Sequence, residues 1–301
     1  MIRSAIRKGF LIYDAQDYER NASYIDWLIR TAEEYRLSLS LITLPASDLA
    51  IGCSYASIGT EHPLHQVIRS LDDFDHGDEA PEQTPEQALP FLINRTRSAL
   101  LAQLAEARGY RVFNSSLVAH LGNDKIAGYR WASELGLSVS PLIDSPTDAD
   151  FPLVQKPVFG HGGRDVRRIE NPLELKILDE PFLLQKPVPR VVGDIRFYVI
   201  GGQCIYSVLR KGNGSFASNF SLGGSIELFQ GNAEQQEQLN IVLRALPIDY
   251  AGVDFLLTED GQLYFNEIED VVGSRMLSAL GCNDTTERFL RHIAATIGNL
   301  L

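Results

Sequence analysis

Apolar and polar positions along the first third of the chain predict an open α/β domain. The apolar run GFLIYD (9–14) is typical of a buried strand, and the apolar residues from Tyr24 to Ala32 follow at helical spacing. LSLSLITLP (37–45) predicts a second strand, which completes a strand–helix–strand unit. Three more segments predict a strand, a helix and a strand: PFLINRT (90–96), SALLAQLAEARG (98–109) and YRVFNSS (110–116).

An acidic stretch, DDFDHGDEAPEQTPEQ (72–87), interrupts this pattern. It holds two prolines and few apolar residues, so it offers little surface whose burial would offset the entropy lost on ordering. We interpret it as a solvated loop or insertion.

From Asn123 onward the pattern changes to helices mixed with antiparallel hairpins. Gly201-Gly202 joins two apolar runs, and Glu259-Asp260-Gly261 joins two more; both are typical hairpin turns. The other predicted elements are helices at 123–136, 232–246 and 285–301 and strands within 151–170 and 182–188. The sequence therefore predicts three domains: an α/β domain at 1–113 and two α+β subdomains at 114–187 and 188–301.

Composition and charge narrow the class of protein. The 301 residues carry 27 basic and 39 acidic side chains, a net charge of −12, which disfavours binding to nucleic acid or to an anionic membrane. No apolar run is long enough to span a bilayer, and the pattern at the N-terminus leads us to expect no signal peptide. The three cysteines (Cys53, Cys204 and Cys282) form no CxxC pair, so we expect a reducing, cytoplasmic environment.

Three carboxylates in the last hairpin are the strongest chemical signal. Glu267 and Glu269 share one face of their strand by alternation, and the turn at 259–261 brings Asp254 opposite them. The flanking residues are apolar, and clustered carboxylates in such a setting need a positive partner. Mg²⁺ bound with nucleotide phosphates is a usual guest of such acids, whereas the alternative is that some of them face solvent.

Two further groups of residues are ambiguous when taken singly. Lys156 ends a strand just before the glycine-rich loop 160–163, where backbone N–H groups can approach phosphate, although many hairpins carry similar turns. Asp194 and Arg196 share a strand face that Arg210 approaches from the next strand, which suits either phosphate binding or a surface ion pair.

The order of these features resembles the ATP-grasp superfamily, and within it the RimK-like carboxylate–amine ligases. The order is a lysine strand, a glycine loop, a second nucleotide-binding strand, D-I-R, an arginine, S-N and then D…E-x-E. The resemblance covers nearly the whole chain and is most specific from the FNSS turn (113–116) onward; ERN (19–21) and INRTR (93–97) resemble the N-terminal pre-ATP-grasp domain of RimK-like proteins. It implies an ATP-grasp fold, in which two antiparallel-sheet subdomains clamp ATP.

The resemblance also implies roles for individual residues. Catalytic roles fall to Arg210, near the transferred phosphate, and to Lys156, which contacts phosphates. The implied ATP-binding residues are Lys125, Lys156, Gly162, Gly163, Gln185, Lys186, Val188, Asp194, Arg196 and Asn219. The implied ligands of Mg²⁺, or of Mn²⁺ in its place, are Asp254, Glu267 and Glu269.

Departures from the family pattern fall on the substrate side. The family's R-S-N reads Ala217-Ser218-Asn219, the last metal ligand is Glu269 where asparagine is common, and the next segment reads DVVG (270–273). Arg275 is a candidate for a substrate carboxylate. The candidates in the N-terminal domain are Arg20, Asn21, Asn94 and Arg95, for which a helix-capping or surface-charge role is an equal alternative.

The expected function is an ATP- and Mg²⁺-dependent ligase that joins a carboxylate, carried by an amino acid or peptide, to an amine or a thiol through an acyl phosphate. Two alternatives stay open at this point: an ATP-grasp kinase that does not ligate, and a nucleotide-binding module without catalysis. The expected partners are small-molecule or peptide carboxylate and amine substrates, without nucleic acid or membrane. The sequence leaves the oligomeric state open, and a homo-oligomer is compatible with it.

Overall fold

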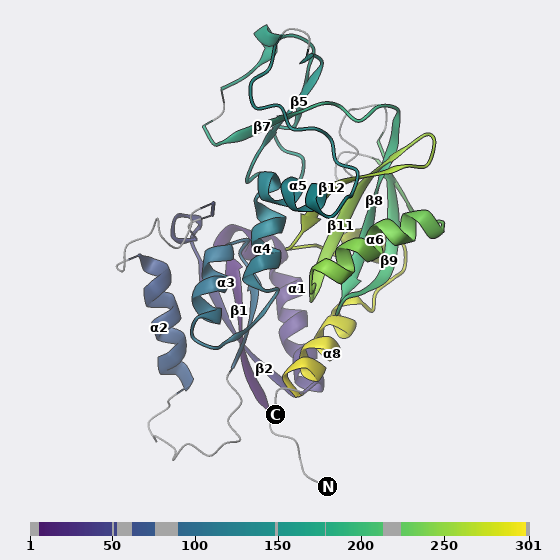
Figure 1. Ribbon diagram of the computed structural model, residues 1–301. Coiled ribbons are helices and arrows are strands. Elements are labelled where there is room, and N and C mark those ends of the chain that lie inside the picture. Colours follow the sequence, from purple (N-terminus) through teal and green to yellow (C-terminus); the bar gives the residue numbers. More distant parts are fainter. Residues whose placement is uncertain are drawn as a thin grey trace. The chain divides into compact units, whose positions relative to one another are not determined.

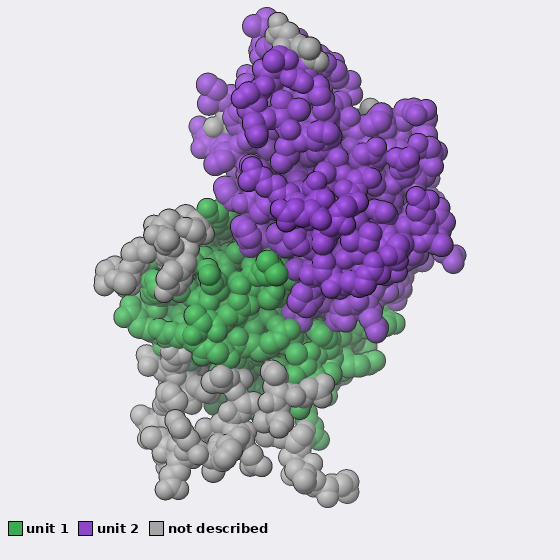
Figure 2. Space-filling model, in the orientation of Figure 1, with its two compact units in different colours: residues 1–119, 283–301 green, residues 120–282 purple. Residues whose placement is uncertain are grey.

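The computed structural model describes residues 6–49, 51–52, 62–75, 90–147, 150–177, 179–212 and 224–298. The chain forms two compact units, which are coloured separately in Figure 2. Unit 1 comprises residues 1–119 together with 283–301, and unit 2 comprises residues 120–282. The three-domain division expected from the sequence stays a prediction.

Unit 1 is built on a parallel four-stranded sheet in the order β2-β1-β3-β4. The strands are β1 (Arg7–Asp14), β2 (Leu37–Leu44), β3 (Phe91–Arg95) and β4 (Arg111–Phe113). The helices are α1 (Ala15–Glu34), α2 (Pro63–Asp75), α3 (Ala99–Glu106) and α8 (Thr285–Gly298), with a short 3₁₀ turn at Ala46–Asp48 (Figure 1). Apolar side chains of β1, β3 and β4 pack with those of α2 and α3 into one buried core, as the apolar runs predict.

Two features of unit 1 differ from or extend the sequence-based expectations. Residues 72–75, expected in a solvated loop, end helix α2, and residues 76–87 of that stretch lie outside the described residues. Helix α8, at the far end of the chain, packs in this unit: the Tyr24 hydroxyl of α1 lies 3.3 Å from Oγ1 of Thr286.

Unit 2 holds two antiparallel sheets. The five-stranded sheet has the order β10-β9-β8-β11-β12, and the three-stranded sheet has the order β6-β5-β7. The strands are β5 (Leu153–Pro157), β6 (Arg167–Ile169), β7 (Phe182–Gln185), β8 (Val191–Ile200), β9 (Gln203–Lys211), β10 (Ser225–Leu228), β11 (Tyr250–Thr258) and β12 (Leu263–Glu269). The helices are α5 (Lys125–Glu134), α6 (Ala233–Ala245) and α7 (Arg275–Ala279), with a 3₁₀ turn at Pro172–Glu174. Helix α4 (Ser116–Asn123) precedes α5.

Both hairpins predicted from the sequence are present in the five-stranded sheet. β8 pairs with β9 across Gly201-Gly202, both of which adopt positive φ, and β11 pairs with β12 across the turn at Gly261. Helix α5 begins after Asp124, whose carboxylate accepts a bond from the backbone N–H of Ala127, and it packs on β12. The fold therefore brings the lysine at the start of α5 and the acidic end of β12 to one place.

Candidate active site

A cavity of about 600 Å³ lies within unit 2 and is lined by strands of both antiparallel sheets. One part of its wall is apolar and includes Val154, Val188 and Leu256. Several of the charged side chains that the sequence singled out also line it. The predicted site residues that line it are Lys125, Lys156, Gly163, Gln185, Lys186, Val188, Asp194, Arg210 and Glu267. An apolar region beside converging charges is typical of a ligand site.

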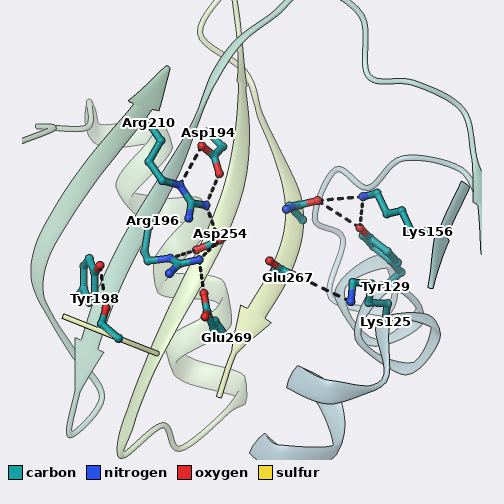
Figure 3. Close-up of polar contacts among 12 residues, drawn as sticks. Lys125, Tyr129, Lys156, Asp194, Arg196, Tyr198, Arg210, Asp254, Glu267 and Glu269 are labelled. Atoms are coloured by element: carbon teal, nitrogen blue, oxygen red, sulfur yellow. Dashed lines mark hydrogen bonds and ion pairs between the residues drawn. The ribbon is translucent and has the colours of Figure 1, made fainter. Parts of the chain in front are cut away.

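A buried network of carboxylates and arginines lies beside this cavity (Figure 3). Asp254, with no exposed surface, accepts bonds from Nε and Nη2 of Arg196 at 2.8 and 2.7 Å and from Nη2 of Arg210 at 2.6 Å. Arg210 also donates through Nε to Asp194 at 3.0 Å, and Arg196 pairs with Glu269. Strand pairing explains the contacts, because Asp254 lies opposite Arg196 and Asp194 lies opposite Arg210. The expected Asp194–arginine pair is therefore buried rather than on the surface.

The arginines fix the charge of the buried acid. Burial alone would raise the pKa of Asp254, but the charges and hydrogen bonds of Arg196 and Arg210 outweigh it and hold that pKa below its usual range. In this network each arginine therefore has an ionised carboxylate as partner.

Two lysines that line the cavity, Lys125 and Lys156, lie across from the network of arginines and carboxylates (Figure 3). Lys125 donates to the carbonyl of Gly160 and lies 4.0 Å from Oε2 of Glu267. Lys156 donates to the Tyr129 hydroxyl at 2.9 Å and to Oδ1 of Asn266 at 3.1 Å. Burial lowers the pKa of Lys125, an effect that Glu267 partly offsets. The two lysines therefore provide adjacent positive charge at one wall of the cavity.

The segment directly after β7, residues 186–188, corresponds to the hinge that the ATP-grasp resemblance implies, and its first residue is bound to other parts of unit 2. The backbone N–H of Lys186 donates to the carbonyl of Pro141 at 3.1 Å, and its carbonyl accepts a bond from the Ser140 hydroxyl. The Lys186 ammonium lies 3.0 Å from Asp150, and hydrogen bonds from Thr147 and Lys186 lower the pKa of that acid to about 2. The backbone of Lys186 is thus engaged within the protein.

Comparison with known proteins identifies the architecture. The family of RimK-like ATP-grasp domains matches residues 137–293, more than half of the chain. This chain belongs to the RimK-like ATP-grasp family. The family's class, an ADP-forming ATP-grasp ligase that makes C–N bonds, is the enzyme class that the resemblance predicted. The predicted fold class, with its parallel-sheet unit and antiparallel ATP-grasp sheets, is confirmed.

Two relatives and one solved structure illustrate what this chain is similar to. An uncharacterized protein of Mycoplasma genitalium is 26% identical over 291 residues, which cover 92% of this chain and 88% of the relative. Human N-acetylaspartylglutamate synthase A is 37% identical over 143 residues, 44% of this chain and 36% of the synthase. D-alanine–D-alanine ligase from Bacillus anthracis, solved with ATP, shares the fold with a TM-score of 0.66 over 98% of each chain, at 17% identity.

The expected metal ligands of this ATP-grasp chain do not form a three-acid cluster. Among the described residues, no three His, Cys, Asp or Glu side chains are grouped as a metal site. Both oxygens of Asp254 accept from arginines, Glu269 pairs with Arg196, and neither acid lines the cavity. Glu267 does line it: burial raises the pKa of Glu267, Lys125 lowers it, and the charges of Asp254 and Glu269 raise it further. The acids therefore lie within electrostatic reach of one another, which suits a divalent cation at Glu267, and the full ligand set stays a prediction.

The other predicted site residues of the RimK-like chain are not brought to the cavity in the same way. Arg196 and Gly162 lie outside its lining, and Asn219 lies outside the described residues, as does Ala217. Arg275 begins α7 and is not among the lining residues. The N-terminal candidates belong to unit 1, where Arg95 ends β3 and Asn94, also in β3, accepts a bond from the backbone N–H of Thr96 and donates to the carbonyl of Ser98.

Sequence reasoning missed two residues at the site, Tyr129 and Asn266. Tyr129 lies one turn after Lys125 on α5, a spacing that a search along the helix face would have found. Asn266 directly precedes Glu267, and strict alternation would direct it away from the cavity.

Among the described residues, no helix has both the length and the apolar character that a membrane span requires.

Proposed function

We propose that this chain binds ATP in the cavity of unit 2 and uses it to activate a substrate carboxylate as an acyl phosphate, which an amine or a thiol then attacks. The observation that supports this most is the cavity itself, which is lined by apolar side chains, by the segment after β7 and by Lys125, Lys156 and Arg210. An adenine ring suits the apolar wall, and a chain of phosphates suits the three cations.

The hinge narrows how the base would bind. Both backbone groups of Lys186 are engaged by Pro141 and Ser140. Val188, which also lines the cavity, is then the residue of this segment best placed to offer its backbone to the edge of the base. Gln185 supports the hinge by donating to the carbonyl of Ser140 at 3.3 Å.

The charged residues would act by positioning and by electrostatics. In the first step a carboxylate oxygen attacks the γ-phosphorus, the bond to the β,γ-bridging oxygen breaks, and ADP leaves. Arg210 and the lysines offset the negative charge that moves during this step. In the second step the amine nitrogen attacks the acyl carbon, the bond from that carbon to the phosphate oxygen breaks, and inorganic phosphate and a proton leave.

A divalent cation, Mg²⁺ or Mn²⁺, completes this proposal. Of the three predicted metal ligands, Glu267 is the one that lines the cavity, and we propose it as the principal ligand, with Asp254 and Glu269 behind it. When bound, such a cation neutralises phosphate charge.

The substrate class is proposed from the relatives. N-acetylaspartylglutamate synthase A, by its name, makes a compound that contains two amino acids. We therefore propose that one of the two substrates here is an amino acid or a peptide.

A screen for ADP release tests this function. Amino acids and amines are supplied singly and in pairs, with ATP and Mg²⁺, and we expect release that requires one acid together with one amine. Release with a single compound that becomes phosphorylated would show a kinase instead, and ATP binding without release under any condition would show a binding module. Glu267→Gln, which keeps the size of the side chain, should abolish release without unfolding the protein; full activity in that variant would contradict the metal assignment.

A further inference from the structure

The contacts of Lys156 point to a role of two neighbouring side chains in positioning its ammonium. An ammonium has three donors. Two of them are directed at Tyr129 and Asn266, at 2.9 and 3.1 Å, and within the described part of the chain these are the protein acceptors that it has. The Tyr129 hydroxyl also donates to Oδ1 of Asn266 at 3.3 Å, which closes a triangle of polar atoms. These two bonds fix the rotation of the Lys156 ammonium and therefore the direction of its third N–H group.

A β-bulge places Asn266 in this triangle. Asp254 pairs with Glu267 and Phe255 pairs with Phe265, so Asn266 is the extra residue of β12. Three consecutive residues, from Phe265 to Glu267, line the cavity, whereas a regular strand would turn the middle one to the other face. Bulges re-aim side chains in this way beside functional sites.

Tyr129 is held in place by its surroundings. Its side chain is 2% exposed, and its ring packs edge-on against Phe265, with centroids 6.2 Å apart and an interplanar angle of 89°. The Lys156 nitrogen lies 5.4 Å from the centroid of the same ring, within the range of a cation–π interaction. Both partners of the lysine therefore come from rigid elements, α5 and β12.

We propose that Tyr129 and Asn266 are positioning residues that hold the Lys156 ammonium so that its remaining donor faces the phosphates of the nucleotide. Both partners are neutral, so they orient the lysine without cancelling its charge. A carboxylate at position 266 would instead form an ion pair with Lys156 and compete with phosphate. This inference rests on the proposed ATP site and deepens it.

Nucleotide affinity tests the proposal, with ATP and adenosine compared by calorimetry on the full chain. Tyr129→Phe and Asn266→Ala should each raise the Kd of ATP about 10-fold, while the Kd of adenosine, which has no phosphate, changes less than about 2-fold. Asn266→Asp should bind ATP more weakly than Asn266→Ala. In the double variant the Kd of ATP should rise by a smaller factor than the product of the two single-variant factors, because both residues act on one ammonium.

Matched controls and Lys156→Ala separate the outcomes. Tyr264→Phe on β12 and Asn240→Ala on the exposed face of α6 remove the same groups at positions that do not line the cavity, and both variants should leave both affinities unchanged. Equal losses for ATP and adenosine would overturn the positioning role, because they indicate a general structural defect. If Lys156→Ala weakens ATP binding and the other two variants do not, this inference fails and the proposed function stands. If Lys156→Ala leaves ATP binding unchanged, the phosphate site is wrong and both fail.

Discussion

At the scale of single residues, the buried carboxylate of Asp254 is the central charge of the site. It joins two arginines that would otherwise face each other in the protein interior. Asp254→Asn keeps the shape and removes the charge, and it leaves Arg196 and Arg210 short of one partner. Removing one member of a buried ion pair costs about 3–5 kcal/mol, and we expect a loss of unfolding free energy of that size in urea denaturation.

A matched change at an exposed ion pair shows whether burial is the cause. Glu227 pairs with Lys211 at 2.7 Å on the surface, and both side chains are about half exposed. Glu227→Gln should change the unfolding free energy by less than about 1 kcal/mol. Equal effects of the two substitutions would contradict the account given for Asp254.

Lys125 provides a prediction for pH dependence. Burial lowers the pKa of Lys125, so as the pH rises this lysine loses its charge earlier than an ordinary lysine, whose pKa is about 10.4. ATP affinity should accordingly begin to fall at a lower pH than the titration of an exposed lysine would give. Lys125→Arg keeps its charge throughout and should flatten the decline.

The measurement for Lys125 is the Kd of ATP in steps from about pH 7 to pH 10. The control is Lys211→Arg, which makes the same exchange at an exposed side chain that does not line the cavity. Parallel curves for the wild type and Lys125→Arg would show that this lysine does not carry the pH dependence.

At the scale of elements, the close approach of β8 and β9 depends on a residue without a side chain. A Cβ added at Gly193 would lie 2.5 Å from the backbone carbonyl oxygen of Arg210, which no rotamer change can relieve. Gly193→Ala should therefore separate the strands that carry Asp194 and Arg210. Overpacking of this kind costs about 1–3 kcal/mol, and thermal denaturation should show the lower stability.

Gly298→Ala is the control for loss of a glycine as such. It lies at the end of α8, where an added Cβ would meet no atom within 4 Å, and alanine is a better helix former. We expect no loss of stability there. A wild-type melting temperature for Gly193→Ala would show that β8 and β9 can move apart without cost.

Elements were predictable from sequence where their cause is local. The turns at Gly201-Gly202 and Gly261 were found because glycine there satisfies a positive φ that few residues tolerate. The bulge at Asn266 was not predicted, because it depends on how β11 pairs with β12. This bulge decides to which face of the sheet the Asn266 side chain belongs. Helix α2 was not predicted, because no element was assigned to residues 63–71 and its last four residues, 72–75, were interpreted as the start of an acidic loop.

The site was predictable to a similar extent. Opposite charges at alternate positions of neighbouring strands led to Asp194, Arg196 and Arg210, which the structure brings together. The sequence did not indicate that these arginines would bind Asp254. That contact depends on the order of the strands in the sheet, which places β8 and β9 near β11. Strand order is a long-range property, and here β8 lies between β9 and β11.

At the scale of the whole molecule, the order of elements was enough for the fold class, whereas contacts between distant parts of the chain were not predicted. A parallel sheet followed by antiparallel hairpins follows from apolar runs and turn residues. The final helix, α8, belongs to unit 1, where it packs on helix α1 near the start of the chain. Such contacts join residues more than 250 positions apart, as between Tyr24 and Thr286, and no local pattern encodes them.

The location of the cavity within unit 2 gives the last prediction. A ligand that binds only the folded protein stabilises it by about 2.7 kcal/mol at a concentration 100 times its Kd. Saturating ATP should therefore raise the melting temperature, and hydrogen exchange should slow most in β5, β7 and β12, whose residues line the cavity. Adenosine should slow exchange in β7, beside the hinge, and have less effect at Lys156 in β5 and Asn266 in β12. Slower exchange confined to the sheet β2-β1-β3-β4 would place the nucleotide in unit 1 and contradict the assignment of this cavity.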